Sequence, residues 1–372
     1  MKKIIPFVAL CACIYSTAHA EIRINGFANL VGGITKSDET LYAYDDNISF
    51  SEESLFAVQI IGDINEKMTA TGQILARGSD DYNAKLEWAY ITYNYSDNLN
   101  ISAGRFRQPL FRYSSSQDIG YSYHWVSAPQ SVYDVPFNSI EGVRLDYNNY
   151  VGDWEYALQL AVGNYSVSND LLELDGRNNV TASIEATYDY LKLRLVYGQA
   201  DTTLNLRPVA PLLAQLEQTL PADLFNNLKQ EEDLGKFIGV GVEIDKFDWF
   251  VSGEFTSVNT EDSFLTEDIA YYVTAGLRFG KYTPSITYER VKDEDDLKFA
   301  NQLVGLPPAL VGAVAGLQNA FISDDSTITL GVRFDHSTNV ALKADLTKYT
   351  DDRDASGNSD ATLLRFAINY VF

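Results

Sequence analysis

The segment 105–139 begins with closely spaced arginines and continues with serine, aromatic and acidic residues. A guanidinium stays charged at any ordinary pH, and it can hold a carboxylate or phosphate with two parallel hydrogen bonds. Fixed charges around a gap also select permeating solutes by the sign of their charge. We therefore predict a selective site lined by arginines, and its candidate residues are Arg77, Arg105, Arg107, Arg112, Asp118, Tyr121, His124, Asp134, Arg144 and Arg365.

The acidic side of this site would be formed by Asp118 and Asp134, which follow the arginines in the same segment. Opposed walls of unlike charge set a transverse field that orients dipolar solutes. The alternative is that the arginines pair with acidic residues nearby and only solvate the wall around them. Glu141, Asp146 and Glu155 are suitable partners. The sequence leaves both interpretations open.

Residues for covalent catalysis are sparse, because the chain after residue 20 has only two histidines, His124 and His336. A relay of Ser122, His124 and Asp134 is conceivable, but such residues often lie close together by chance. Neither a G-x-S-x-G nor an H-E-x-x-H motif occurs. We therefore expect no enzymatic activity, no metal site and no cofactor, and we expect His124 to line a pore or to pack against Trp125.

The first twenty residues have the pattern of a secretory signal peptide. Two lysines precede an apolar run over 4–14, which is too short to span a bilayer, and small residues at 18–20 predict cleavage there. A lipoprotein signal with Cys13 as the lipidated residue is the weaker alternative. Both cysteines belong to the signal 1–20, so the mature domain, 21–372, has neither disulfides nor thiol chemistry.

The charge balance excludes one class of partner. Of the 28 basic residues, Lys2 and Lys3 belong to the signal, which leaves 26 against 51 acidic residues and a net charge of −25. Such acidity argues against nucleic acid, which needs clustered lysine and arginine. Aromatic residues make up 13% of the chain, which favours an ordered, β-rich fold over disorder. No segment after residue 20 has the apolar length of a transmembrane helix, so a membrane form must be a closed barrel.

Strand-like segments of about ten residues run through the mature chain as one series. Short connections rich in Asn, Asp and Gly alternate with long polar ones, and transmembrane barrels have this asymmetry of periplasmic turns and outer loops. An even number of strands brings both chain ends to the periplasmic side, where the first and last strands can pair. The sixteen predicted strands are 22–34, 48–62, 67–77, 84–95, 99–106, 140–148, 153–164, 178–189, 191–201, 236–246, 247–257, 268–280, 282–292, 325–335, 338–348 and 361–372.

Side-chain polarity alternates with period two along these segments, as in a wall that is apolar toward lipid and polar inside. A charge on the lipid face near the midplane would cost about 2–4 kcal/mol, which specifies the register. In 84–95 the phase is ambiguous, because Leu86 and Trp88 compete with Ile91 for the lipid side. The final segment ends the chain on an aromatic residue, and its apolar face consists of Leu364, Phe366, Ile368, Tyr370 and Phe372. An edge strand of a soluble sandwich is the alternative for this segment alone.

Two long loops contain apolar residues at helical spacing, over 211–220 and 297–320. We expect helices folded onto the barrel mouth, with a hinge or a partner-docking loop as the alternative. Acidic residues gather in the loops, for example at 293–296. Such residues would bind divalent cations and bridge the phosphates of lipopolysaccharide, although solvation of the surface is the simpler interpretation.

Two motifs carry a resemblance to a known family. The C-terminal strand resembles the last strand of Gram-negative outer-membrane barrels. The sequence G-R-F-R-Q-P at 104–109, followed by Y-D at 133–134, resembles the segment after the fifth strand in sixteen-stranded proteobacterial porins, although the Pro-Glu-Phe-Gly-Gly run of that family is absent. The resemblance implies a homotrimer whose third loop folds into the barrel and narrows the pore, and it is nearer to porins of the anion or dicarboxylate type.

The sequence therefore predicts an all-β protein, a transmembrane antiparallel barrel of sixteen strands with short periplasmic turns, long extracellular loops and the third loop in the lumen. The predicted function is an outer-membrane porin through which small hydrophilic solutes and ions diffuse, with loop 105–139 and the arginines favouring anionic solutes. Expected partners are outer-membrane lipid, lipopolysaccharide and further copies of the chain. The alternative is a surface receptor or adhesin in which loops 202–235 and 293–324 plug the lumen.

Overall fold

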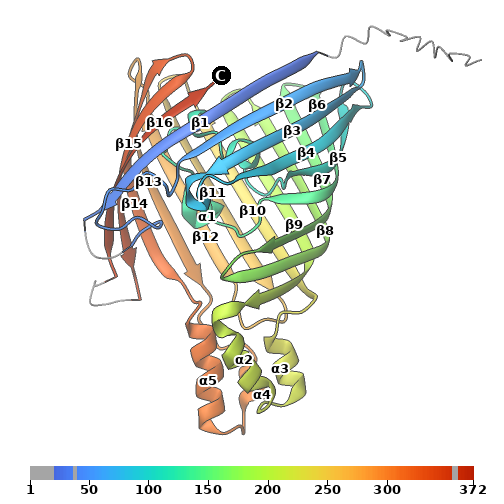
Figure 1. The fold of residues 1–372 in the computed structure, drawn as a ribbon, viewed down its shortest axis with the longest axis vertical. Helices are drawn as coiled ribbons and strands as arrows, with labels where there is room; N and C mark the ends of the chain where they lie inside the picture. The colour runs from blue at the N-terminus through green and yellow to red at the C-terminus, as the bar shows by residue number, and fades with distance from the viewer. Residues whose placement is uncertain (1–20, 37–39, 354–358) are drawn as a thin grey trace, which may run out of the picture.

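The computed structural model describes residues 21–36, 40–353 and 359–372, so the predicted signal peptide lies outside the described residues. Sixteen antiparallel strands follow one another around a closed barrel (Figure 1), which confirms the predicted fold class. The strands are β1 (Ile22–Thr35), β2 (Leu55–Asn65), β3 (Met68–Arg77), β4 (Ala84–Asn94), β5 (Leu99–Arg107), β6 (Ser139–Val151), β7 (Trp154–Ser168), β8 (Leu172–Tyr188), β9 (Leu191–Leu206), β10 (Asp233–Asp245), β11 (Trp249–Thr260), β12 (Asp268–Leu277), β13 (Tyr282–Asp293), β14 (Asp324–Ser337), β15 (Val340–Asp351) and β16 (Ala361–Val371).

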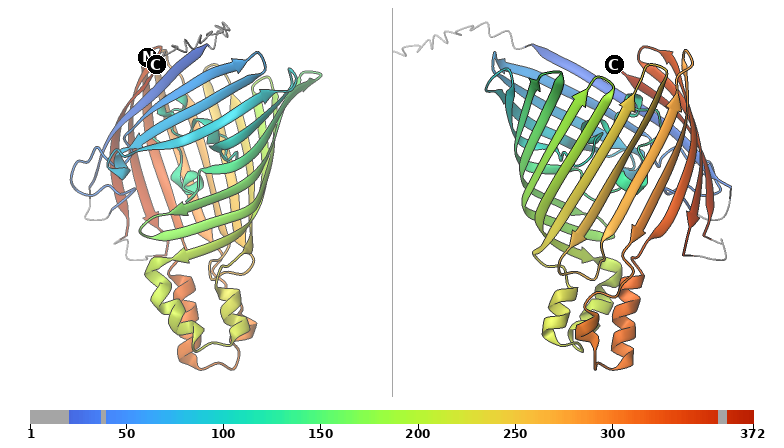
Figure 2. Two further views of the ribbon diagram at one scale, coloured as in Figure 1. Left: turned by 45° about the vertical axis from the view of Figure 1, so that its right-hand side comes forward. Right: turned by 180° about the vertical axis from the view of Figure 1, so that it is seen from behind.

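The first and last strands close the barrel. β1 pairs with β16 from Phe27 opposite Val371 to Thr35 opposite Leu363. Beyond this ladder, Gly26 and Phe372 exchange two backbone hydrogen bonds of 2.9 Å. The chain end and the short turns lie at one end of the barrel, here called the turn end, and the long loops lie at the opposite loop end (Figure 2).

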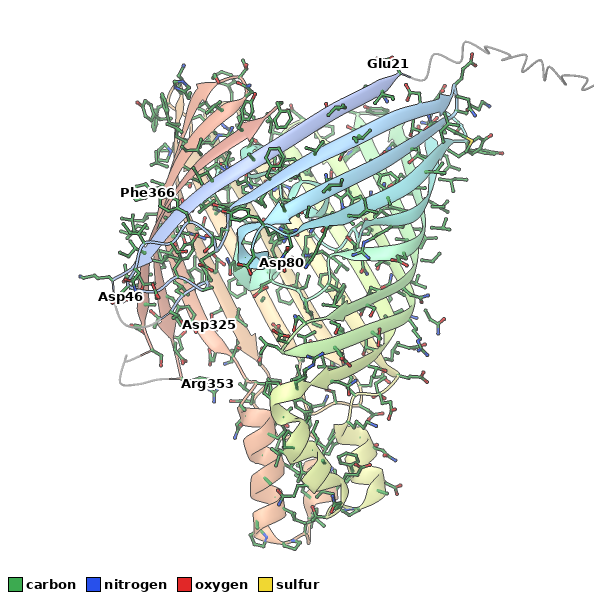
Figure 3. All side chains as sticks on the ribbon, in the orientation of Figure 1. Glu21, Asp46, Asp80, Asp325, Arg353 and Phe366 are labelled. Carbon is green, nitrogen blue, oxygen red and sulfur yellow. The ribbon has the colours of Figure 1, made fainter. Side chains whose placement is uncertain are left out.

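The wall has one apolar and one polar face. On β14 and β15, Thr329 and Thr347 are buried and share a hydrogen bond of 3.0 Å inside the barrel, whereas Leu330 and Leu346 are exposed on the outside. Phe366 of β16, labelled in Figure 3, belongs to the same outward set. The period-two pattern of the sequence therefore assigns the two faces correctly on these strands.

The ambiguous phase of the fourth strand has a structural cause. Opposite Gln73 and Ile74 the register of β4 shifts by one residue, because Glu87 forms a bulge. The bulge lets Leu86 and Ile91 both face outward, while Trp88 turns into the lumen. One extra residue in a strand reverses the phase of the side chains that follow it.

Two of the predicted segments differ most from the structure. The strand predicted over 48–62 begins only at Leu55, because the Ser54 hydroxyl binds the backbone of Val31 instead of continuing the ladder. The loop predicted over 165–177 is almost all strand, and only 169–171 connect β7 to β8. In this region the outward residues of β8 are charged, so the strand extends beyond the apolar band and the lipid-based rule no longer applies.

The remaining elements are short helices in the loops. The helices expected in the two long loops are present, but they do not fold onto the mouth. They pack on one another around buried Leu216, Leu224, Phe225, Val314 and Leu317, and they project away from the loop end (Figure 1). No described helix is long and apolar enough to cross a membrane. The helices are η1 (Gly78–Asp80), η2 (Ser114–Ser116), η3 (Gly120–Ser122), α1 (Gln130–Tyr133), η4 (Arg207–Val209), α2 (Ala210–Glu217), α3 (Ala222–Leu228), α4 (Ala300–Leu303) and α5 (Pro308–Asn319).

A substitution at Gly26 tests the closure of the barrel. A Cβ atom at Gly26 would lie 2.2 Å from the ring of Phe372 and 2.8 Å from the carbonyl oxygen of Ala57. We expect Gly26→Val to lower the free energy of unfolding by about 1–3 kcal/mol, as other overpacked sites do. Urea unfolding in lipid vesicles measures this.

The control is Ala182→Val, because Ala182 is exposed on the outward face of β8, away from the closing strands. Equal stability of the two variants would contradict the closure described here.

Candidate pore site

Residues 108–138, the third long loop, lie inside the barrel and are held by inward side chains of the wall (Figure 1). Lys343 of β15 donates a hydrogen bond of 2.5 Å to the carbonyl oxygen of Trp125. The carboxylate of Asp345 accepts one of 2.9 Å from the backbone N–H of Val126. These contacts come from the same polar face that the strand pattern predicts, so the wall fixes the course of the loop.

Asp118 is the most strongly paired acidic residue of the loop. Its carboxylate forms an ion pair of 2.8 Å with Arg77 of β3 and a second ion pair with Arg107 of β5. Glu87 lies 3.6 Å from Arg107 and shares the cluster. Burial opposes ionisation of Asp118, but Arg107 and Arg77 outweigh it and hold the pKa of this carboxyl below its ordinary value. Asp118 was expected on an acidic wall opposite the arginines, but in the structure it contacts two of them directly.

A basic cavity of about 130 Å³ lies between the first half of the loop and the wall formed by β4 to β7 and β9. Four arginines line it and no carboxylate does. Two of these arginines form ion pairs with carboxylates of the barrel wall that lie outside the cavity lining. Arg112 pairs with Glu243, and Arg144 pairs with Asp146 at 2.8 Å. The lining consists of Trp88, Tyr90, Phe106, Arg107, Pro109, Phe111, Arg112, Ser114, Ser115, Arg144, Gln159 and Arg194.

An acidic cavity of about 320 Å³ lies beside β1 to β3. Its charged lining consists of Glu52, Glu53, Asp118 and Asp134, with Arg77 as the one basic residue among those described. Arg365 does not line this cavity. Its guanidinium forms an ion pair of 2.9 Å with Glu53, which does line the cavity, and is itself almost fully buried. Burial raises the pKa of Asp134.

Arg105 does not join the candidate site. Its side chain forms an ion pair of 3.3 Å with Glu141, and both residues have the outward phase of Ala103 and Val143. Gly104 has a φ of 134°, a conformation that favours glycine, so the strand is irregular at this point. The sequence motif had placed Arg105 on the inner basic wall.

Tyr121 and His124 serve as contacts of the loop. The Tyr121 hydroxyl donates a hydrogen bond of 2.9 Å to the carbonyl oxygen of Thr338. The His124 ring packs at a tilt against Trp125 with ring centres 4.0 Å apart, and one of its nitrogens lies 3.1 Å from the hydroxyl of Thr274. Burial, and then the nearby cations led by Lys343, hold the pKa of His124 well below its ordinary value. The imidazole is therefore neutral.

The described contacts do not assemble a catalytic relay. The Ser122 hydroxyl donates to the carbonyl oxygen of Ser116 at 3.3 Å, whereas His124 contacts Thr274 and Asp134 lines two cavities. Among the residues that the structure describes, no three His, Cys, Asp or Glu side chains are placed to hold a metal ion.

Two further arginines bind the loop and were missing from the predicted site. Arg194 of β9 donates a hydrogen bond of 2.7 Å to the carbonyl oxygen of Pro109, and Arg333 of β14 donates to Tyr121 and Tyr123. Both have the inward phase of their strands. Counting residues from the turn end places both arginines near that end of the barrel and away from the loop. The sequence does not reveal the tilt of each strand or the course of the loop, so the count is misleading here.

A family model described as Gram-negative porin matches residues 8–371. The chain belongs to the Gram-negative porin family. Solved structures agree in fold. The outer-membrane channel DcaP of Acinetobacter baumannii is similar with a TM-score of 0.61 and 11% identity over 96% of this chain and 99% of that one. A loop-deletion mutant of OmpT of Vibrio cholerae is similar with a TM-score of 0.59 and 12% identity over 95% of this chain and 99% of that one. OmpF of Salmonella typhi in complex with daunomycin is similar with a TM-score of 0.58 and 15% identity over 95% of this chain and 98% of that one.

No curated protein matches the sequence of this porin. The family and the fold make it an outer-membrane channel protein, with the turn end of the barrel toward the periplasm.

The substitution Asp118→Asn tests how the loop of the porin is held. It leaves the buried guanidinium of Arg107 without its closest carboxylate, and we expect the free energy of unfolding to fall by about 3–5 kcal/mol, as for other broken buried ion pairs. Asp134→Asn is the control, because Asp134 lies in the same loop without an ion pair to any described residue.

Measurement against pH sharpens this test. Because the folded pKa of Asp118 is lowered, its stabilisation is complete above the ordinary carboxyl pKa of about 3.9 and disappears as the pH falls below it. The difference between wild type and D118N should shrink in the same window. A difference that persists unchanged in acid would contradict the ion-pair account.

Proposed function

We propose that this porin lets small hydrophilic solutes diffuse passively through the lumen, with a preference for anions, and that it catalyses no reaction and needs no cofactor. The observation that carries the proposal is the basic cavity, in which four arginines and no carboxylate face one space. Fixed charge at the narrowest place selects permeating solutes by sign.

The loop supports this proposal by narrowing the lumen on the arginine side. Arg194 forms no ion pair with any described residue, and its Nε atom has no hydrogen-bond partner among them. One nitrogen of Arg112 is also unpartnered. A guanidinium without a carboxylate partner, as at Arg194, suits a carboxylate or phosphate that passes through. Acids on the distant outer loops matter less, because a Debye length is about 8 Å at physiological salt.

We propose that the porin assembles as a homotrimer through the outward face of β1 to β3. Near the turn end this face carries small residues, Gly26, Ala28, Gly62, Ala70 and Gly72, as the register of the three strands requires. Larger residues, among them Ile22, Ile24 and Ile60, lie beside them on the same outward face. Small residues let two membrane proteins approach closely.

Lipopolysaccharide is a further proposed partner. Outside the loop ends of β8 to β10, charged residues replace the apolar band, including the pairs Arg177–Glu232 at 3.1 Å and Arg207–Glu173 at 2.9 Å. Their height matches that of lipid head groups and sugars, where divalent cations can bridge acidic groups to phosphates.

A surface-receptor role is the second candidate function, and the projecting helices α2 to α5 favour it. They have an apolar core of their own and stand clear of the barrel, where another molecule can reach them (Figure 2).

The double substitution Arg144→Gln/Arg194→Gln tests the anion preference. It removes two charges from the basic cavity, and we expect the ratio of chloride to potassium permeability to fall at least about twofold, since fixed charge sets this ratio. The reversal potential under a tenfold KCl gradient measures the change.

Arg105→Gln is the control, because it removes one arginine charge from the outer face of the wall. An unchanged reversal potential in the double variant, or an equal change in R105Q, would sink the proposed selectivity.

The trimer proposal has its own test in Ala70→Trp. We expect this variant to fold and to migrate as a monomer in native gels, because the indole fills a face that must lie flat against a second barrel. Ala182→Trp places the same side chain on the outward face of β8 and should remain trimeric. Trimers in both variants would exclude the face of β1 to β3.

A further inference from the structure

The inner face of the barrel changes character near the loop end of β8 and β9. Two cross-strand pairs of leucines, Leu172–Leu206 and Leu174–Leu204, face the lumen there. Phe237 of β10 continues this apolar wall. Polar side chains cover the inner face closer to the middle of the same strands, where Thr181 and Ser183 are buried.

The third loop completes an apolar cavity against this wall. Leu110, Val135 and Phe137 face it from the loop, and Phe137 stacks on Tyr165 of β7 with ring centres 4.1 Å apart. The cavity has a volume of about 420 Å³, which lies in the range of small-molecule sites. Apolar surface in contact with water costs about 25 cal/mol per Å², and large patches of it mark binding sites. We call this space the vestibule.

The vestibule adjoins the basic cavity through one stretch of backbone. Along residues 107–112 the side chains divide between the two spaces: Gln108 and Leu110 face the vestibule, whereas Arg107 and Arg112 face the basic cavity. A solute with an apolar body and an anionic head therefore finds an apolar surface on one side of this stretch and arginines on the other. The lining of the vestibule contains three acidic residues, Asp134, Asp268 and Asp293, and one basic residue, Lys236. This excess of negative charge would repel an anionic head from the vestibule.

We propose that the vestibule binds the apolar body of amphipathic carboxylates, with an aromatic ring or a medium-length alkyl chain, and presents their heads to the arginines. The inference rests on the proposed anion preference and deepens it, because it names the class of anion. The site raises the local concentration of such solutes at the entrance of the narrow region.

Isothermal titration of the refolded protein with 4-phenylbutyrate, acetate and 4-phenylbutylamine tests this inference, with the detergent or lipid alone as the blank. We expect 4-phenylbutyrate to bind at least about tenfold more tightly than acetate, since the phenyl group leaves water. Equal binding of the two carboxylates would overturn the inference. Tighter binding of the amine would also overturn it, because the head would then lie at Asp268 and Asp293.

Variants locate the site. The double substitution Leu172→Asn/Leu206→Asn should weaken the binding of 4-phenylbutyrate at least about tenfold. Val258→Asn, at the cross-strand neighbour of Phe237 on β11, gives a second test if the double variant does not fold. Val304→Asn is the matched control, because Val304 lies 82% exposed between α4 and α5, outside the barrel. Loss of binding in V304N, or none in the vestibule variants, would contradict the assignment.

The reversal potential of wild-type protein separates the two proposals. Chloride preference without selective binding of 4-phenylbutyrate leaves the porin proposal standing and rejects the vestibule. Selective binding together with cation preference supports the vestibule and rejects the proposed selectivity.

Discussion

The structure depends on closure of one hydrogen-bonded sheet. Inside a bilayer no water satisfies backbone N–H and C=O groups, so a strand-built wall is stable there only without edges. The pairing of β1 with β16 meets this requirement. Because the number of strands is even, closure also places the chain ends and short turns on one side and all the long loops on the other. The third loop can then enter the lumen only from the outer side.

The polar inner face has two consequences that cannot be separated. Its charged residues would be costly against lipid, but inside they hold the third loop through backbone carbonyl and N–H groups, as Lys343 and Asp345 do. Since the loop is fixed by side chains at many heights, it divides the lumen unevenly. Arginines line one cavity and mostly carboxylates another, so a protein with a strongly acidic total charge still has a basic cavity in its lumen.

The sequence predicts the barrel well because the two-residue period reports directly on lipid and water. The same rule explains the errors. It fails at 165–177, where β8 extends above the membrane and water lies on both sides of the wall. It fails at Glu87, where a bulge changes the phase. At Arg105 the period itself is kept and points the side chain outward with Ala103, so the error there came from the arginine motif and not from the period. Which arginines meet the loop also depends on strand tilt and on the path of the loop, and no local pattern encodes either.

Single cysteines test the central claim, the separation of charge by the loop, most directly, because residues 21–372 contain no cysteine. Ser115→Cys places a thiol in the basic cavity and Ser79→Cys places one in the acidic cavity. Anionic and cationic methanethiosulfonates are applied to the open channel, and their rates of reaction are compared. The account predicts that the anionic reagent reacts faster at position 115, with a drop in conductance, and that the cationic reagent reacts faster at position 79. Equal rate ratios at both positions would contradict it.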